Sequence, residues 1–306
     1  MKIVILGAGG VGGYFGARLA SAGSQVTFVA RGEHLTAMRR TGLRLTSGLG
    51  DMVLHHVNAV ESIEDAGDAD LVVVCVKLWE TEAVARSLRP ITERGAAIVS
   101  LQNGVQKEAL LRMHVPHTAI VGGVCYIAAS IAEPGAIAHS GTMQKIVVGE
   151  FSQTDSTRCA DFVDDCRRAD IDAEVSADIE RTIWEKFVMI VGASATTSMY
   201  RTTIGAIRDD REMRATLLSI LQEAVAVGRA EGVRLAEDFA RDRLAFLDGL
   251  PPGMRSSMAL DLERGNRLEL PWLSGGVVAL GAARGVATPA NQRVVDALTP
   301  FVPGTR

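Results

Sequence analysis

The sequence predicts an α/β fold, in which an N-terminal Rossmann-type domain with a doubly wound parallel sheet is followed by an all-helical C-terminal domain. The chain has 306 residues, enough for two domains of roughly 150 residues each. A glycine-rich turn directly follows the first apolar run. Strand-like runs alternate with helical patterns over residues 1–177 and disappear from residue 178 onward. We therefore expect a nucleotide domain over 1–177 and a helical domain over 178–306.

The N-terminal elements follow in order. Ile3–Leu6 is a short apolar run that ends in glycines and is typical of a buried parallel strand. Val11–Ala22 has helical spacing, Gly23 can end that helix, and Gln25–Ala30 is rich in β-formers, which together indicate a βαβ unit. Further helices are predicted over 33–40 and 81–88. Further strands are predicted over 43–45, 52–57, 71–76, 96–101, 119–124, 136–139 and 146–148, with a turn at Pro134-Gly135.

The second domain has a different character, because β-rich runs are missing from it. Pro251-Pro252-Gly253 interrupts its helical patterns and is expected to be a lid or a connector. The cleft between the two domains is the default position for an active site. Helices are predicted over 180–199, 211–231, 237–247, 257–264, 272–283 and 289–301.

Composition excludes several classes of function. Only 5% of the residues are aromatic and the net charge is −4, so a nucleic-acid partner is not expected. The longest apolar runs, such as Leu71–Val76, fall far short of the roughly 20 residues that span a bilayer. Met1 leads at once into a strand-like run, which leaves no room for a signal peptide. The four cysteines form no CxxC pair, so we expect a soluble, cytoplasmic protein without a metal site.

The segment Gly7-Ala8-Gly9-Gly10-Val11-Gly12 matches the pattern G-x-G-x-x-G after a strand and at the start of a helix. Gly7 permits a tight turn, Gly9 lets the backbone approach a pyrophosphate, and Gly12 allows the helix to pack closely on the strand. The N–H groups at the start of the helix, around Gly10 and Val11, attract phosphates. The alternative is a glycine-rich turn that holds no ligand.

The end of the second strand indicates which dinucleotide is bound. An NAD site usually has Asp or Glu there to hold the ribose 2′-hydroxyl. Here the strand ends in Val29-Ala30-Arg31-Gly32, and the guanidinium of Arg31 suits a 2′-phosphate. Glu33 is the rival residue, although it lies beyond the strand, and a solvated Arg31 is the other alternative. The pattern favours NADP.

The chain resembles the ketopantoate reductase family (2-dehydropantoate 2-reductases) within the 6-phosphogluconate dehydrogenase-like superfamily. The likeness covers nearly the whole chain and implies NADPH-dependent reduction of a 2-oxo acid to a 2-hydroxy acid, in pantothenate biosynthesis. The segments that carry it are "KIVILGAGGVGGYFGARLASAG", "VARGEHL", "VVVCVKLWET", "VSLQNGV", "WEKF", "SSMALDLERGNRLEL" and "GVVALGAARGVATPANQRVVDAL".

The resemblance also implies roles for individual residues. Lys186 of "WEKF" matches the catalytic lysine, which gives a proton to the ketone oxygen as NADPH delivers hydride. Glu269 of "NRLEL" matches the glutamate that orients this lysine and the substrate. Asn103 of "LQNGV" matches an asparagine near the nicotinamide and the substrate. Lys77 of "CVKLWET" matches a lysine of the cofactor site, and Ser257 falls where the family holds the substrate carboxylate.

Physical chemistry supports these roles unevenly. A ketone oxygen gains negative charge as hydride arrives, so it needs a donor at that point. An ammonium in a cleft can be this donor, since burial lowers the pKa of a lysine toward a useful range. Lys186 lies among apolar residues, although a lysine that snorkels from a helix start is the alternative. Asn103 follows an apolar strand, at the end where such sheets bind ligands. The role of Glu269 rests on the resemblance.

The sequence departs from the family at the substrate wall. The family has asparagines four and eight residues after the lysine, on the same helix face. Here these positions are Ile190 and Ser194, and Met254 replaces an asparagine just before the carboxylate-binding serine. A buried substrate hydroxyl without a partner costs roughly 1–3 kcal/mol. A less polar 2-oxo acid or a related ketone is therefore an open alternative to ketopantoate.

Three functions compete at this point. The first is an NADPH-dependent reductase of the ketopantoate type. The second is another NADP-dependent dehydrogenase with the same two domains that acts on a different ketone or alcohol. The third is a dinucleotide sensor without turnover, which the pair Lys186 and Glu269 disfavours because a sensor needs no proton donor. The pattern leaves formation of a homodimer open.

Overall fold

The computed structural model describes residues 1–152 and 155–305, which form an α/β unit and a helical unit. The two-domain α/β fold is therefore confirmed. One short segment departs from the simple order along the chain, because it lies between strands of the first unit and yet packs with the second. The first unit contains Met1–Gln102 and Lys107–Ile179, and the second contains Asn103–Gln106 and Glu180–Arg306.

The first unit is built on one mixed sheet, in the order β4-β3-β9-β8-β7-β6-β1-β2-β5, with β10 paired to β9. The run from β8 to β5 is parallel, as expected, whereas β8 and β9 are antiparallel and so are β3 and β4. The strands are β1 (Lys2–Leu6), β2 (Gln25–Val29), β3 (Leu43–Ser47), β4 (Met52–Leu54), β5 (Asn58–Val60), β6 (Leu71–Val74), β7 (Ala97–Ser100), β8 (Ile120–Glu133), β9 (Ala136–Gly149) and β10 (Asp172–Val175).

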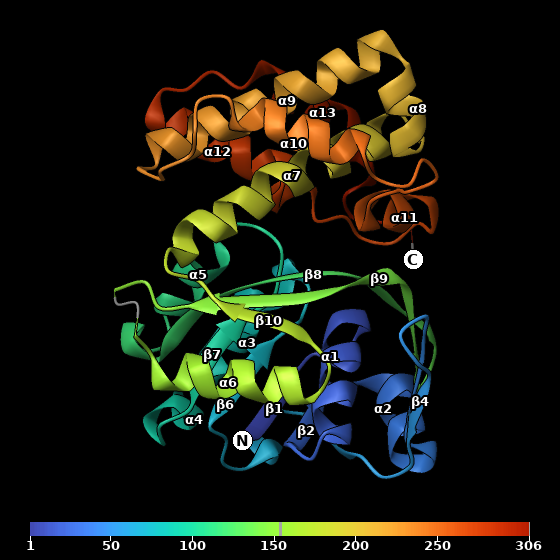
Figure 1. Ribbon diagram of the computed structural model, residues 1–306, viewed down its shortest axis with the longest axis vertical. Coiled ribbons are helices and arrows are strands. Elements are labelled where there is room, and N and C mark those ends of the chain that lie inside the picture. The colour runs from blue at the N-terminus through green and yellow to red at the C-terminus, as the bar shows by residue number, and fades with distance from the viewer. Residues whose placement is uncertain (153–154, 306) are drawn as a thin grey trace. The chain divides into compact units, whose positions relative to one another are not determined.

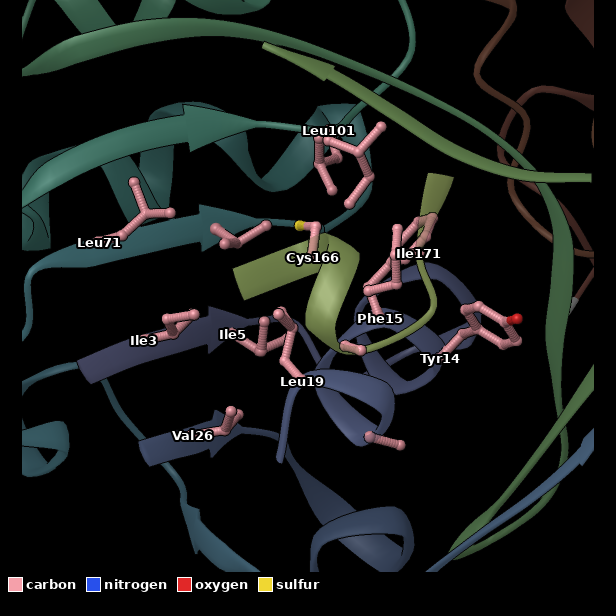
Figure 2. Close-up of a cluster of buried hydrophobic side chains, with 14 of the residues drawn as sticks. Ile3, Ile5, Tyr14, Phe15, Leu19, Val26, Leu71, Leu101, Cys166 and Ile171 are labelled. Carbon is pink, nitrogen blue, oxygen red and sulfur yellow. The ribbon is translucent and has the colours of Figure 1, made fainter. Parts of the chain in front are cut away.

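Both faces of the parallel part are buried, which makes the sheet doubly wound. Ile3 and Ile5 of β1 belong to one core cluster, while Val4 and Leu6 belong to another. Figure 2 shows the first cluster, where Phe15 of α1 packs with side chains of the strands and of α6. The helices of this unit are α1 (Gly10–Ser21), α2 (Gly32–Thr41), α3 (Thr81–Ser87), α4 (Arg89–Glu93), α5 (Lys107–Arg112) and α6 (Thr157–Arg168).

The sequence prediction was least accurate at the hairpin of β8 and β9, and β8 runs to Glu133 where a strand over 119–124 was expected. Two short strands were expected over 136–139 and 146–148, but one strand of 14 residues covers both. The polar stretch between them is exposed, so it has no apolar alternation to reveal a strand. Gln144 pairs with Ile127 of β8, and the register then shifts, so that the next pair toward the predicted Pro134-Gly135 turn is His139 with Ala129.

The second unit is entirely helical, as expected (Figure 1). Close packing explains some of its glycines: a Cβ at Gly192 would lie 2.5 Å from Leu221. The exposed Pro251-Pro252-Gly253 segment is joined to the start of α8, because the Gly205 N–H donates to the Pro252 carbonyl over 2.9 Å. The helices are α7 (Ile179–Met199), α8 (Ile204–Asp209), α9 (Arg211–Ala230), α10 (Phe239–Asp248), α11 (Ser257–Glu263), α12 (Ser274–Arg284) and α13 (Pro289–Leu298).

Two further findings apply to the described residues. Within 1–152 and 155–305, none of the helices has both the length and the apolar character needed to cross a bilayer. The same residues contain no group of three or more His, Cys, Asp or Glu side chains arranged to hold a metal ion.

Burial raises the pKa values of Cys75, Cys159 and Cys166, which keeps these thiols protonated at neutral pH.

Candidate active site

The glycine loop joins β1 to α1 and has the geometry of a dinucleotide turn. Gly7 has φ +102°, and a Cβ there would lie 2.8 Å from the backbone nitrogen of Val76. A Cβ at Gly12 would lie 2.2 Å from the carbonyl oxygen of Gly7. A Cβ at Gly9, in contrast, would meet nothing within 4 Å. Packing therefore requires glycine at positions 7 and 12, while Gly9 faces open space that a phosphate can approach.

The N-terminus of α1 is free to bind an anion. Gly9 is its N-cap residue and provides no side-chain cap, and the first turn contains no acidic residue. Neither the cap residue nor the first turn of α1 thus supplies a side chain that neutralises the N–H groups or the positive end of the helix dipole. Gly10 and Val11 begin this helix, as the sequence suggested. Gly10 also has a packing role, because a Cβ there would lie 2.2 Å from the carbonyl oxygen of Ala129 on β8.

Arg31 is the N-cap residue of α2 and its side chain is 71% exposed. Sequence reasoning found no acid beside it, but the structure places Glu80 there, with 3.7 Å between Arg31 Nη1 and Glu80 Oε2. Such an exposed ion pair contributes about 1 kcal/mol at most. It leaves the guanidinium available to a phosphate. Lys77, the other expected cofactor residue, is exposed just before η2 (Leu78–Glu80), with its ammonium 5.7 Å from the Trp79 ring centroid.

We expect NADPH to bind at least tenfold more tightly than NADH, and Arg31→Ala to abolish most of that preference. A tenfold ratio corresponds to about 1.4 kcal/mol, which is modest for a charge-assisted contact. Fluorescence titration of both cofactors measures it. Glu80→Gln is the matched control, since it removes the competing acid and should not weaken NADPH binding. Equal affinities for the two cofactors in the wild type would contradict the assignment of Arg31.

In the helical unit, Lys186 and Asn103 are brought together. Lys186 lies on α7 and is only 6% exposed. Its Nζ donates a hydrogen bond to Asn103 Oδ1 over 2.9 Å. An amide oxygen is a neutral acceptor, so this contact orients the ammonium without taking its proton. The two residues are 83 positions apart in the sequence, and they were predicted from separate motifs.

The segment Asn103–Gln106 is held against α12. A Cβ at Gly276 of α12 would lie 2.4 Å from Gln106 Nε2, so the glycine makes room for the glutamine side chain. Glu269 lies just before the 3-10 turn η4 (Leu270–Trp272), which precedes α12, and is 8% exposed. Its backbone carbonyl accepts hydrogen bonds from Trp272 and Leu273. Glu269 is thus fixed by local structure in the same unit as Lys186.

The remaining predicted residues are distributed as follows. Ile190 is partly buried one helical turn after Lys186, and Ser194 is buried one turn further on. Ser257 is the exposed first residue of α11, where the preceding Ser256 is the N-cap and accepts a hydrogen bond from the Ala259 N–H.

Sequence reasoning missed Lys107, which is fully buried at the start of α5. Its Nζ donates to the carbonyl of Ser100 over 2.7 Å and to that of Gly123 over 2.6 Å. Glu108 Oε1 lies 2.9 Å away and makes no hydrogen bond, so this contact is an ion pair only. A cation at a helix N-terminus opposes the helix dipole. The unfavourable position of this lysine was the available signal that its ammonium has partners elsewhere, which are the carbonyls of Ser100 and Gly123.

Comparison with known proteins decides the family. Residues 3–153 match the profile described as "Ketopantoate reductase PanE/ApbA", and residues 178–301 match its C-terminal counterpart. A 2-dehydropantoate 2-reductase of Halobacterium salinarum is 31% identical over 97% of both chains. The chain belongs to the ketopantoate reductase family. It is accordingly an oxidoreductase that acts on CH–OH groups, and the resemblance found in the sequence is confirmed.

Solved structures agree with this family. A 2-dehydropantoate 2-reductase of Geobacter metallireducens GS-15 has 30% identity and a TM-score of 0.91, covering 98% of this chain and 99% of the other. A D-mandelate dehydrogenase solved with NADH and anilino(oxo)acetate has a TM-score of 0.90 at 19% identity, with 98% of each chain covered. At that identity the second structure shows a shared fold.

Proposed function

We propose that this ketopantoate reductase family member reduces a 2-oxo acid to the 2-hydroxy acid with NADPH, and that Lys186 donates the proton. The observation that carries the proposal is the buried ammonium of Lys186, which is oriented by Asn103 over 2.9 Å. NADPH, when bound, supplies the hydride. The glycine loop with Gly9 and the free start of α1 fit its pyrophosphate, and Arg31 fits its 2′-phosphate.

The chain's own residues supply the acid chemistry. As the ketone carbon accepts hydride, charge develops on its oxygen, and a pre-oriented ammonium stabilises that charge before giving up a proton. An ammonium has three donors. Asn103 accepts from one of them, which fixes the direction of the others. Glu269, buried in the same unit, has the role of orienting the lysine and the substrate.

Apolar side chains of α7 that follow Lys186 suggest the substrate class. Ile190, Met189 and Ala193 are partly buried and apolar, and they lie one to two turns beyond Lys186. A substrate hydroxyl that faced them would lose its solvent without gaining a partner. We infer a preference for 2-oxo acids whose side chains are apolar. Oxidation of NADPH measured against a panel of 2-oxo acids, ketopantoate included, tests both the reaction and this class.

Ile190→Asn is expected to shift the preference toward ketopantoate by up to roughly tenfold, about 1.4 kcal/mol, because an amide can pair with the substrate hydroxyl. The wild type should reduce ketopantoate no better than the analogue in which that hydroxyl is replaced by hydrogen. The measurement is the ratio of kcat/KM for the two substrates in both proteins. Met254, which is 41% exposed, gives a second variant, Met254→Asn. A wild type that strongly prefers ketopantoate would refute this substrate class.

A further inference from the structure

His34 connects three elements around the glycine loop, all within the α/β unit. It is the third residue of α2, and its ring is half-buried. Its Nε2 lies 2.9 Å from the carbonyl oxygen of Ala8, the second residue of the loop. The backbone N–H of Gly135, in the turn between β8 and β9, donates to its Nδ1 over 3.1 Å.

These two contacts determine the protonation of the ring. Because Nδ1 accepts a hydrogen bond from Gly135, it carries no proton, and the proton of the neutral ring is on Nε2. Nε2–H therefore donates to the Ala8 carbonyl. Burial lowers the pKa of His34, which favours this neutral form at pH 7. The Gly135 carbonyl accepts from the Arg44 N–H over 2.9 Å, so the turn that faces Nδ1 is itself anchored to β3.

The contact with Ala8 controls the direction of the next N–H group. In a trans peptide the C=O and the following N–H point to opposite sides. Holding the Ala8 carbonyl toward His34 therefore turns the Gly9 N–H away from His34. The Ala8 N–H donates to the Val29 carbonyl over 3.1 Å, and the Gly9 carbonyl accepts from Gly13 over 2.6 Å. The carbonyl oxygens of Ala8 and Gly9, which would repel a phosphate, thus both accept hydrogen bonds from groups within the protein.

We infer that His34 is a positioning residue for the dinucleotide, acting through Ala8 to orient the pyrophosphate-binding N–H groups. It also ties the loop to the start of α2, whose N-cap residue is Arg31. Both contact regions of the cofactor, the pyrophosphate loop and the 2′-phosphate arginine, would then be held in one arrangement. This inference rests on the proposed binding of NADPH, and it makes no use of the ketone or of Lys186.

Two substitutions separate the two contacts of the ring. Glutamine can place an amide N–H near the position of Nε2, whereas asparagine can place an acceptor near Nδ1 but does not reach Ala8. We expect His34→Asn and His34→Leu to raise the Kd for NADPH by about five- to tenfold, the effect of losing one hydrogen bond. His34→Gln should restore the Kd to within about threefold of the wild type. Thr36 is an exposed residue of the same helix, and Thr36→Ala, which should leave the Kd for NADPH unchanged, is the control for a general effect on α2.

The readouts are the Kd from NADPH fluorescence, kcat at saturating NADPH, and Tm. Kd should change while kcat does not, since His34 touches none of the reacting atoms. Wild-type affinity in His34→Asn, or a His34→Gln variant as weak as His34→Leu, would overturn the inference. A wild type that binds NADPH but reduces no 2-oxo acid would overturn the proposed reaction, and the Kd values would still decide the role of His34. A wild type that binds no dinucleotide would overturn both.

Discussion

Replacing Lys186 by alanine is expected to lower kcat/KM for the best 2-oxo acid by about 10²–10⁴, the usual effect of removing a general acid. The lost group is a buried ammonium that Asn103 orients over 2.9 Å. The Kd for NADPH should change little, because the glycine loop and Arg31 belong to the other unit. Steady-state kinetics on the 2-oxo acid panel, together with NADPH titration, measure both effects.

Lys145→Ala is the matched control for loss of a lysine. Lys145 is a partly exposed residue of β9 in an ion pair with Glu174, and it has no part in the proposed reaction. Its kcat/KM should stay within about twofold of the wild type, as for most surface substitutions. A Lys186→Ala enzyme with near wild-type turnover would show that Lys186 is structural and that another group donates the proton.

The second large effect concerns stability. Lys107→Met should reduce the free energy of unfolding by about 3–5 kcal/mol, the range found when one partner of a buried ion pair is removed. Glu108 would remain buried without its cation, and the carbonyls of Ser100 and Gly123 would lose their donor. Urea denaturation followed by circular dichroism gives this energy, from the midpoint and slope of the transition.

The double variant Lys107→Met, Glu108→Gln tests the cause. Removing the stranded carboxylate should recover part of the lost stability, because an amide is less costly to bury than an unpaired charge. Lys145→Met, at a solvent-accessible ion pair, should change stability by about 1 kcal/mol or less. A loss of less than 1 kcal/mol in Lys107→Met would mean that the ammonium and its partners are replaced without penalty.

The fold was largely predictable because short stretches of the sequence identify its core elements. Ile3–Leu6 and Leu71–Val74 are fully apolar strands of a sheet that is buried on both faces, and the glycine loop follows directly from its spacing. The β8–β9 hairpin was not predictable in full, since its outer part is exposed and is held by backbone pairing. Pairing between backbones leaves no side-chain pattern to read.

The site was predictable only in parts. Lys186 and Asn103 were recognised from separate motifs, but nothing in the spacing of the sequence indicates a hydrogen bond between residues 83 positions apart. Glu80 was missed as the neighbour of Arg31 for the same reason. The hydrogen bonds of His34 and Lys107 are made with backbone groups, which are common to all residue types. Side-chain identity therefore does not show which backbone group is the partner.

The membership of Asn103–Gln106 in the helical unit has a consequence for the order of events during translation. Asn103 is made 83 residues before Lys186. At about 5–20 residues per second, the partner of Asn103 emerges roughly 4–17 s later. All ten strands found in the described part of the chain have been synthesised by then, since β10 ends at Val175. The segment Asn103–Gln106 therefore precedes its partners in the helical unit, and the hydrogen bond between Lys186 and Asn103 can form only after the α/β unit has been synthesised.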